Sequence, residues 1–184
     1  AIIQEFESCG WVFHSRVTIW KCPVIERERT NNNGLLHKTV MRDRSQVRQG
    51  MADYLIVFRK PPAEGDGLMS AKPIASKGFD RYVGELDPRE CKDHPSPFAR
   101  KSKSSAASID IWQRYADPVW FDINQTNVLN FKEPTSEKDV KHICPLQLDL
   151  IERSVHIWSD EGDVVLSPFA GIGSEGVGAL KLGR

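Results

Sequence analysis

The sequence predicts an α/β domain with a mainly parallel sheet, and three observations support this prediction. A glycine-rich turn near the end of the chain separates a short apolar run from a helical segment. Helix-like and strand-like segments alternate along most of the sequence. With 184 residues, 40% of them hydrophobic, the chain can bury one sizeable core. The predicted order is helix, strand, basic loop, strand, variable region, helix, strand, glycine loop and helix.

The first third of the sequence predicts one helix and two strands. Ile2 and Phe6 share the apolar side of an amphipathic helix, and Gly10 marks its end. Residues 11–20 alternate aromatic and β-branched residues with polar ones, a pattern typical of a strand. Residues 54–58 form a short apolar run of the length of a buried strand.

Between these strands, residues 26–50 form a polar, arginine-rich stretch that we expect to be a loop. The chain has 25 basic and 25 acidic residues, so a nucleic-acid surface would have to come from local clustering. Arginine suits the geometry of phosphate groups. The candidate DNA-binding residues are Lys38, Arg42, Arg44 and Arg48. The alternative is a solvated face that is partly neutralised by Glu26, Glu28 and Asp43.

Residues 61–108 are rich in Gly, Pro, Ser and Lys, and residues 101–108 read as a flexible stretch. Segments of this length without regular structure are uncommon and often functional. Aromatic residues return at Trp112, Tyr115 and Trp120. We expect these three side chains in the core, ahead of the alternative that they stack on a nucleic-acid base.

The last part of the sequence predicts a helix, a buried strand, a glycine turn and a second helix. Pro145 suits the first turn of a helix whose apolar positions extend from Leu146 to Ile157. Residues 164–166 read as the strand, and a helix is expected over residues 174–182. A strand, a glycine turn and a helix let the backbone approach a nucleotide-like ligand closely. This order indicates a bound cofactor.

The same segment resembles the DNA amino-methyltransferases of the beta group, which use S-adenosylmethionine. The chain reads His142-Ile-Cys-Pro145, then Gly162-Asp-Val-Val-Leu-Ser-Pro-Phe-Ala-Gly-Ile-Gly173, and finally Leu182-Gly-Arg184. The resemblance implies a Rossmann-like methyltransferase fold with a circularly permuted motif order. It divides the chain into strands of the catalytic subdomain with the basic loop (residues 1–60), a target-recognition insert (residues 61–115) and a cofactor-binding segment (residues 116–184).

The resemblance also implies which residues hold S-adenosylmethionine, although the chain departs from the family pattern. The acidic residue that precedes Pro-Phe in the family is Ser167 here, and the lysine before the proline is Cys144. Asp122 and residues 124–127 could reach the adenosine of the cofactor. The predicted cofactor-binding residues are Ser167, Pro168, Phe169, Ala170, Gly171, Ile172, Gly173, Ser174, Glu175, His142, Cys144 and Pro145.

The activity implied by the resemblance is transfer of a methyl group to the exocyclic amine of a base in double-stranded DNA, with adenine ahead of cytosine as the target. Enzymes of this group bind the flipped base with an Asp/Asn/Ser-Pro-Pro-aromatic tetrapeptide. The sequence contains no such tetrapeptide, and it begins without methionine inside an expected helix. We therefore expect a piece of a longer polypeptide that is inactive alone, and we assign no catalytic residue.

Two other functions remain open at this point. The chain could be a non-catalytic DNA-binding or accessory module that keeps the methyltransferase fold. A nucleotide-dependent dehydrogenase is a weaker alternative, because Gly171, Gly173 and Gly176 formally match a dinucleotide-binding pattern. Four scattered cysteines and the lack of a signal peptide favour a cytoplasmic protein. The resemblance implies a bacterial or phage origin. A restriction or helicase protein, or a fused domain, is a candidate partner; no metal and no membrane are expected.

Overall fold

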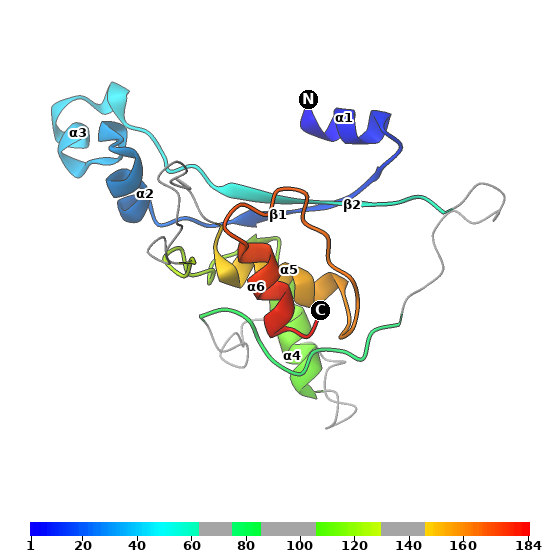
Figure 1. Cartoon of the computed structure of the whole chain (residues 1–184). Helices are drawn as coiled ribbons and strands as arrows, with labels where there is room; N and C mark the ends of the chain where they lie inside the picture. Colours follow the sequence, from blue (N-terminus) through cyan, green and yellow to red (C-terminus); the bar gives the residue numbers. More distant parts are fainter. Residues whose placement is uncertain (63–74, 86–105, 130–145) are drawn as a thin grey trace, which may run out of the picture. The chain divides into compact units, whose positions relative to one another are not determined.

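Figure 1 shows the computed structural model of the chain, which describes residues 1–62, 75–85, 106–129 and 146–184. The chain divides into two compact units. The first consists of residues 1–76 and 118–121, and the second of residues 77–117 and 122–184. Helices and a small sheet are both present, as expected of an α/β fold. None of the described helices is long and apolar enough to cross a membrane.

The sheet of the first unit has three strands in the order β2-β1-β3. β1 (Val12–Ile19) pairs antiparallel with β2 (Asp53–Arg59), and it pairs in parallel with the short β3 (Val119–Trp120). The pairing places Ile19 opposite Asp53, so the chain re-enters the sheet beside the point where it left. Parallel neighbours would need a crossover connection instead. The described sheet is therefore mixed, and the prediction of a mainly parallel sheet is wrong for it.

The predicted first helix and the two long strands are confirmed. α1 (Ile2–Ser8) ends before Gly10, whose φ of 87° is one that glycine adopts readily. The ring of Phe6 on this helix stacks on that of Phe58 in β2, with 4.6 Å between the centroids. Apolar cover of this kind, together with the buried Ile19, stabilises the sheet of the first unit.

The basic loop predicted between β1 and β2 contains four short helices. They are α2 (Pro23–Thr30), η1 (Asn33–Leu35), α3 (His37–Arg42) and η2 (Arg44–Gln46). We call residues 23–50 the basic insertion (Figure 1). Each helix has at most eight residues, and periodicity is not visible over so few positions. Side-chain caps are present at η1 and η2, where Asn32 and Asp43 accept from backbone N–H groups, whereas α2 and α3 have none. The hydrophobic pattern therefore predicted only a loop.

The second unit contains three helices, α4 (Ala106–Tyr115), α5 (Leu148–Trp158) and α6 (Ser174–Lys181). The predictions of α5 and α6 are confirmed. α4 was not predicted, and it includes residues 106–108 of the stretch that we expected to be flexible. Tyr115 and Trp120 are buried as expected, whereas Trp112 is 56% exposed because it lies on the outer side of α4.

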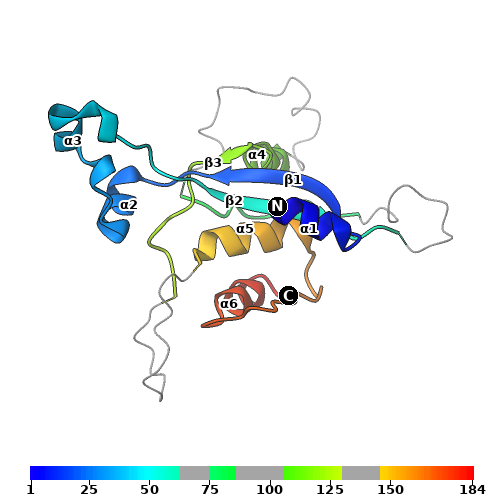
Figure 2. The same cartoon turned by 90° about the horizontal axis from the view of Figure 1, so that it is seen from above.

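α5 and α6 pack against each other (Figure 2). Ile151 lies against Gly178, and the Lys181 ammonium pairs with the Glu152 carboxylate at 2.7 Å. Further along both helices, Arg184 donates hydrogen bonds to Ser159.

The predicted strand at residues 164–166 does not form. This segment has no regular secondary structure and pairs with no described strand, and Val164 and Leu166 are 94% and 87% exposed. An isolated strand leaves its N–H and C=O groups without a ladder, and its apolar side chains need a covering layer to be buried. Nothing in the described part of the chain provides either one, so the apolar pattern alone was not sufficient.

Candidate functional site

The predicted glycine turn is present at the start of α6. Gly171 and Gly173 have φ values of 53° and 88°, in the left-handed region that favours glycine. Gly173 is the residue that precedes the helix, and its N–H donates to the carbonyl of Ala170 at 2.7 Å. A residue with a β-carbon would be strained at either glycine. The backbone geometry therefore explains why both positions are occupied by glycine.

The glycine turn is open to solvent. A β-carbon built on Gly173 would meet no atom within 4 Å, and the ring of Phe169 is 87% exposed. Ser174, by contrast, is only 3% exposed, so α6 is anchored from its first residue. An open turn of two glycines ahead of an anchored helix allows close approach of a ligand to the backbone. In this respect the turn fits the amino-acid end of S-adenosylmethionine.

Most of the predicted cofactor-binding residues belong to this one feature. Residues 167–175 form the turn and the first residues of α6, so the structure brings them together in sequence order. His142, Cys144 and Pro145 lie outside the described residues. Asp122, which was expected to reach the adenosine, has a fully buried side chain and is not available to a ligand. The role of residues 167–175 in binding stays a prediction.

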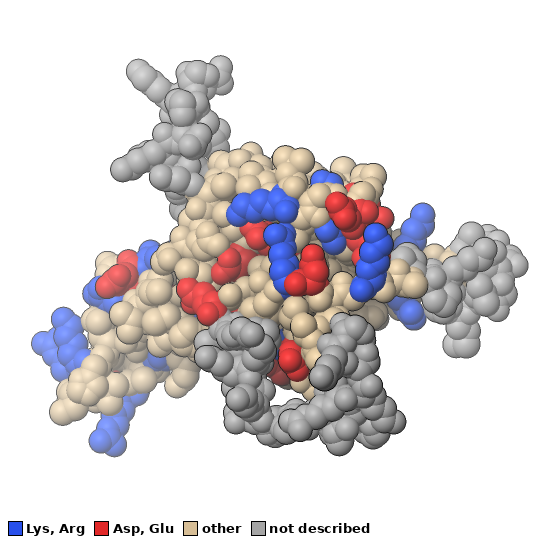
Figure 3. Space-filling model, turned by 90° about the horizontal axis from the view of Figure 1, so that it is seen from below, with Lys and Arg blue, Asp and Glu red and all other residues tan. Residues whose placement is uncertain are grey.

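The candidate DNA-binding residues all lie on the surface of the basic insertion. Lys38 and Arg42 belong to α3, Arg44 begins η2, and Arg48 follows it; all four are exposed. Within the described part of the chain none of them forms an ion pair. In Figure 3 the end of the molecule that carries α2 and α3, on the left, shows several Lys and Arg side chains at its edge and fewer Asp and Glu side chains. This surface can attract a polyanion.

The second unit contains a buried ion pair that the sequence analysis did not find. The Arg153 guanidinium on α5 donates to Asp122 Oδ2 at 2.9 Å, and both side chains are fully buried. It also donates to the carbonyl of Val83 at 2.6 and 2.9 Å. The hydroxyl of Tyr82 donates to Asp122 Oδ2 as well. Arg153 therefore fastens residues 77–85, which we call the strap, to α5.

The pKa of Asp122 is the result of opposing effects of burial and of its neighbours. Burial alone would raise the pKa of this carboxyl, but the hydrogen bond and the charge of Arg153, together with the hydrogen bond of Tyr82, lower it below its ordinary value. Burial and the hydrogen bond to Asp122 raise the pKa of Tyr82. Asp122 is therefore charged, and Tyr82 is neutral, in the folded protein at neutral pH.

Tyr115 and His156 belong to the same cluster. The hydroxyl of Tyr115 accepts a hydrogen bond from Val83 N at 2.9 Å and lies 3.2 Å from His156 Nδ1. Burial raises the pKa of Tyr115 to about 12. Burial also lowers the pKa of His156, although Asp80, 3.4 Å from its Nε2, opposes this shift. The cluster is structural, because its groups hydrogen-bond to one another and to the strap.

One signal in the sequence could have revealed this cluster. Arg153 lies three residues after Leu150 and two residues after Ile151, which are both buried on the same helix. An arginine on the apolar side of a helix needs a buried partner. The identity of that partner, Asp122, depends on tertiary structure, because 31 residues separate the two.

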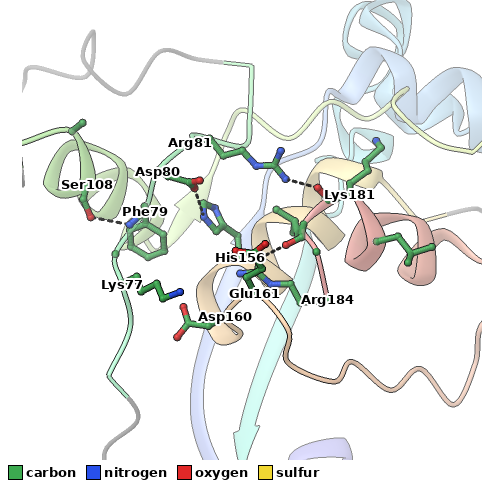
Figure 4. A pocket seen from close by; sticks show the side chains of 15 residues that line it. Lys77, Phe79, Asp80, Arg81, Ser108, His156, Asp160, Glu161, Lys181 and Arg184 are labelled. Carbon is green, nitrogen blue, oxygen red and sulfur yellow. Dashed lines mark hydrogen bonds and ion pairs between the residues drawn. The ribbon is translucent and has the colours of Figure 1, made fainter.

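A cavity of about 820 Å³ lies in the second unit (Figure 4). The last residues of the chain, from Leu180 to Arg184, line it together with the strap residues Lys77 to Arg81 and with His156, Asp160 and Glu161 at the end of α5. Figure 4 shows cationic and anionic side chains mixed around it, with Asp80 directed at His156 and Arg81 at the carbonyl of Lys181. This cavity lies at the last residues of α6 and the glycine turn at its first, so they are at opposite ends of the helix. The cavity is therefore a separate feature from the predicted cofactor site.

Comparison with known proteins gives one result. A model of the DNA methylase family matches the chain over residues 1–184, so the match includes the strands, the basic insertion and the glycine turn alike. Comparison with curated proteins gives no match, and comparison with solved structures gives none either. The match over the whole sequence agrees with the glycine turn at the start of α6 and with the basic surface of the first unit. The chain belongs to the DNA methylase family, the amino-methylating DNA methyltransferases.

Proposed function

We propose that this chain forms the cofactor-binding part of a methyltransferase that moves a methyl group from S-adenosylmethionine to the exocyclic amine of a DNA base, with adenine ahead of cytosine. The glycine turn carries this proposal, because Gly171 and Gly173 both adopt left-handed conformations immediately before an anchored helix. Membership of the DNA methylase family supports the reaction class. A Rossmann-like fold with permuted motif order is part of the same proposal.

The residues of the chain would hold the cofactor chiefly through the backbone. S-adenosylmethionine supplies an electrophilic methyl group on a sulfonium, and the acceptor amine attacks it directly. The first N–H groups of α6 suit the carboxylate at the amino-acid end of the cofactor, because the start of a helix carries partial positive charge. Phe169 offers an exposed apolar ring beside the turn. Ser167 presents no carboxylate, so backbone contacts carry more of the binding than in family members that have an acidic residue there.

The DNA partner would meet the basic insertion. Its exposed Lys38, Arg42, Arg44 and Arg48 form no ion pairs among the described residues, so their charges are available to phosphate groups. Double-stranded DNA is the partner that this proposal names, with a restriction or helicase protein or a fused domain as a further candidate. We place the protein in the cytoplasm of a bacterium, where bacterial or phage DNA is accessible.

The first test is a cofactor-binding measurement on the Gly173→Val variant. S-adenosylhomocysteine, the product form of the cofactor, is titrated by calorimetry against the wild type and the variant. Valine in a left-handed conformation distorts the turn, so we expect binding to be lost while the helical circular-dichroism signal is kept.

Gly162→Val is the matched control for this experiment. Gly162 has the same φ of 88° and the same absence of atoms within 4 Å of a built β-carbon, but it lies outside the glycine turn. Backbone strain is therefore equal in the two variants. If both lose binding to the same extent, or if neither does, the assignment of the turn to the cofactor is wrong.

One observation keeps a second function in view. The sequence contains no Asp/Asn/Ser-Pro-Pro-aromatic tetrapeptide, so the chain could bind DNA as an accessory module without methylating it. Because this chain alone is expected to be inactive, the full-length protein is incubated with DNA and with S-adenosylmethionine carrying a labelled methyl group, and nucleoside chromatography separates the functions. Labelled N6-methyladenine or N4-methylcytosine identifies the target base, whereas tight DNA binding without any labelled nucleoside supports the accessory function.

A further inference from the structure

The acidic residue at the centre of the basic insertion bonds to its own chain instead of to the neighbouring arginines. Asp43 lies between Arg42 and Arg44 in the sequence, yet it forms no ion pair with either one among the described residues. Its Oδ1 accepts hydrogen bonds from the N–H of Ser45 at 3.0 Å and from the Ser45 hydroxyl at 2.6 Å. Its Oδ2 accepts one from the Gln46 amide at 2.8 Å. Asp43 is the capping residue of η2.

The turn that Asp43 caps carries two of the candidate DNA-binding arginines. Arg44 is the first residue of η2, and Arg48 follows its last turn. The N–H of Arg48 donates to the carbonyl of Gly34 at 3.1 Å. A β-carbon on Gly34 would lie only 3.0 Å from Arg48 Cγ, so the Arg48 side chain passes directly over this glycine. η2 is thereby fastened at one end by Asp43 and at the other by η1.

A second carboxylate, that of Glu26, also accepts a hydrogen bond from the backbone, at the end of the insertion. Both oxygens of Glu26 on α2 accept from the N–H of Met51, at 3.1 and 3.3 Å, just before β2 begins. Two of the three acidic side chains of the insertion therefore hold its backbone, and Glu28 is the third. Its six basic side chains are exposed or half-buried; they are Arg27, Arg29, Lys38, Arg42, Arg44 and Arg48.

We propose that the basic insertion is a prefolded phosphate-binding element, in which Asp43 positions Arg44 and Arg48 and so promotes DNA binding although its own charge opposes it. This inference rests on the proposed function, because it takes DNA as the partner. An ordered element loses less conformational entropy on binding than a flexible loop with the same charges. Repulsion between one exposed carboxylate and a phosphate is weak in water and is screened by salt. Positioning therefore outweighs the unfavourable charge.

Two substitutions of Asp43 separate its positioning of Arg44 and Arg48 from the effect of its charge. Asp43→Ala and Asp43→Asn remove the same negative charge, but asparagine keeps an oxygen that can accept from Ser45 N. The Gln46 amide can turn and present its oxygen to the new amide group. Glu28→Ala is the charge control, because Glu28 is exposed and makes no hydrogen bond within the described residues.

The measurement is fluorescence anisotropy of a labelled duplex DNA titrated with each protein at one fixed salt concentration. We expect Asp43→Ala to weaken binding about 3- to 10-fold, the range that follows from losing a helix cap. Asp43→Asn and Glu28→Ala should bind as tightly as the wild type or more tightly. Circular dichroism of each variant verifies that the rest of the chain is folded.

Each outcome has a definite meaning. If Asp43→Ala and Asp43→Asn both strengthen binding as Glu28→Ala does, charge alone governs the insertion and the inference is overturned. If they both weaken it equally, an oxygen that can accept from Ser45 N does not restore binding, so the cap is not what promotes it, which also overturns the inference. If the wild type does not bind duplex DNA, or if replacing Arg42, Arg44 and Arg48 has no effect, the DNA-binding part of the proposed function fails, and the inference fails with it.

Discussion

At the scale of single residues, Gly84 is the glycine least able to accept a side chain among those that the structure describes. Its φ is +148°, and a β-carbon there would overlap Arg153 Nη2 and Asp122 Oδ2. These atoms form the buried ion pair that holds the strap on α5. Any side chain at this position therefore forces apart two buried charges, and separated buried charges are strongly destabilising.

We expect Gly84→Ala to lower the free energy of unfolding by about 2–4 kcal/mol, the sum of overpacking and of damage to the ion pair. Urea unfolding followed by circular dichroism measures this change. Gly162→Ala is the control, since its φ is also positive but its surroundings are open; strain alone should cost about 1–2 kcal/mol there. Equal losses in the two variants would show that the ion pair is not disturbed.

His156 makes the stability of the second unit dependent on pH. Burial lowers its pKa in the folded protein below its ordinary value of about 6.5. The unfolded chain therefore takes up a proton at a higher pH than the folded chain does. This contribution to stability is complete above pH 6.5 or so and is lost as the pH falls through the range between the two pKa values.

We expect the urea midpoint to fall as the pH decreases from about 7.5 to 5.5, and His156→Gln to flatten this dependence over the same range. His37→Gln is the control, because His37 is exposed on α3. A midpoint that is independent of pH in the wild type, or equally dependent in His156→Gln, would contradict the assignment.

At the scale of elements, the contact between α5 and α6 holds the glycine turn in place. Gly178 lies on the α5 side of α6, where a β-carbon would come within 2.6 Å of Ile151 Cγ2. Gly176, one half-turn earlier, faces open space, with no atom within 4 Å of a built β-carbon. Gly178 therefore allows the close contact with α5, whereas the structure leaves room for a side chain at Gly176.

The same substitution should have opposite effects at these two positions. Gly176→Ala should stabilise the protein by up to about 1 kcal/mol, because alanine favours the helix. Gly178→Ala should destabilise it by about 1–2 kcal/mol, because the gain in propensity is smaller than the cost of moving Ile151. Thermal unfolding of both variants measures the signs, and two stabilising substitutions would show that the helices do not pack closely at Gly178.

The elements that the sequence predicted correctly are those with a local pattern. α1, α5 and α6 show helical spacing or clear end signals, and β1 and β2 show strand-like runs between turn residues. α4 was missed because Ser and Lys just before it suggest flexibility, while its burial comes from contacts with the strap. The strand expected at residues 164–166 was wrong because its pattern describes a buried environment that the described residues do not supply.

At the scale of the whole molecule, DNA binding depends on the distribution of charged side chains and not on the net charge of the chain. The chain has zero net charge, with 25 basic and 25 acidic residues. The side chains of Arg42, Arg44 and Arg48 are nevertheless exposed together on one insertion. Contacts of arginine with phosphates release counterions, so each contact contributes to the salt dependence of binding.

We expect the triple substitution of Arg42, Arg44 and Arg48 by alanine to weaken binding to every duplex sequence. The slope of log K against log salt should flatten by about 2–3 units, close to 0.9 for each lost phosphate contact. Titrations of one duplex at several salt concentrations measure this slope. Loss of binding to a single recognition sequence, with the slope unchanged, would mean that the insertion contacts bases instead.

The sequence by itself determined the glycine turn, its helix, the two long strands and the basic character of the insertion, because each depends on residues within a few positions of one another. Tertiary structure alone decided that β1 and β2 are antiparallel and that Asp122 pairs with Arg153. Each of these outcomes is a choice among several partners that the sequence makes available. The choice depends on which groups become buried or close together in space, and a one-dimensional pattern does not contain those distances.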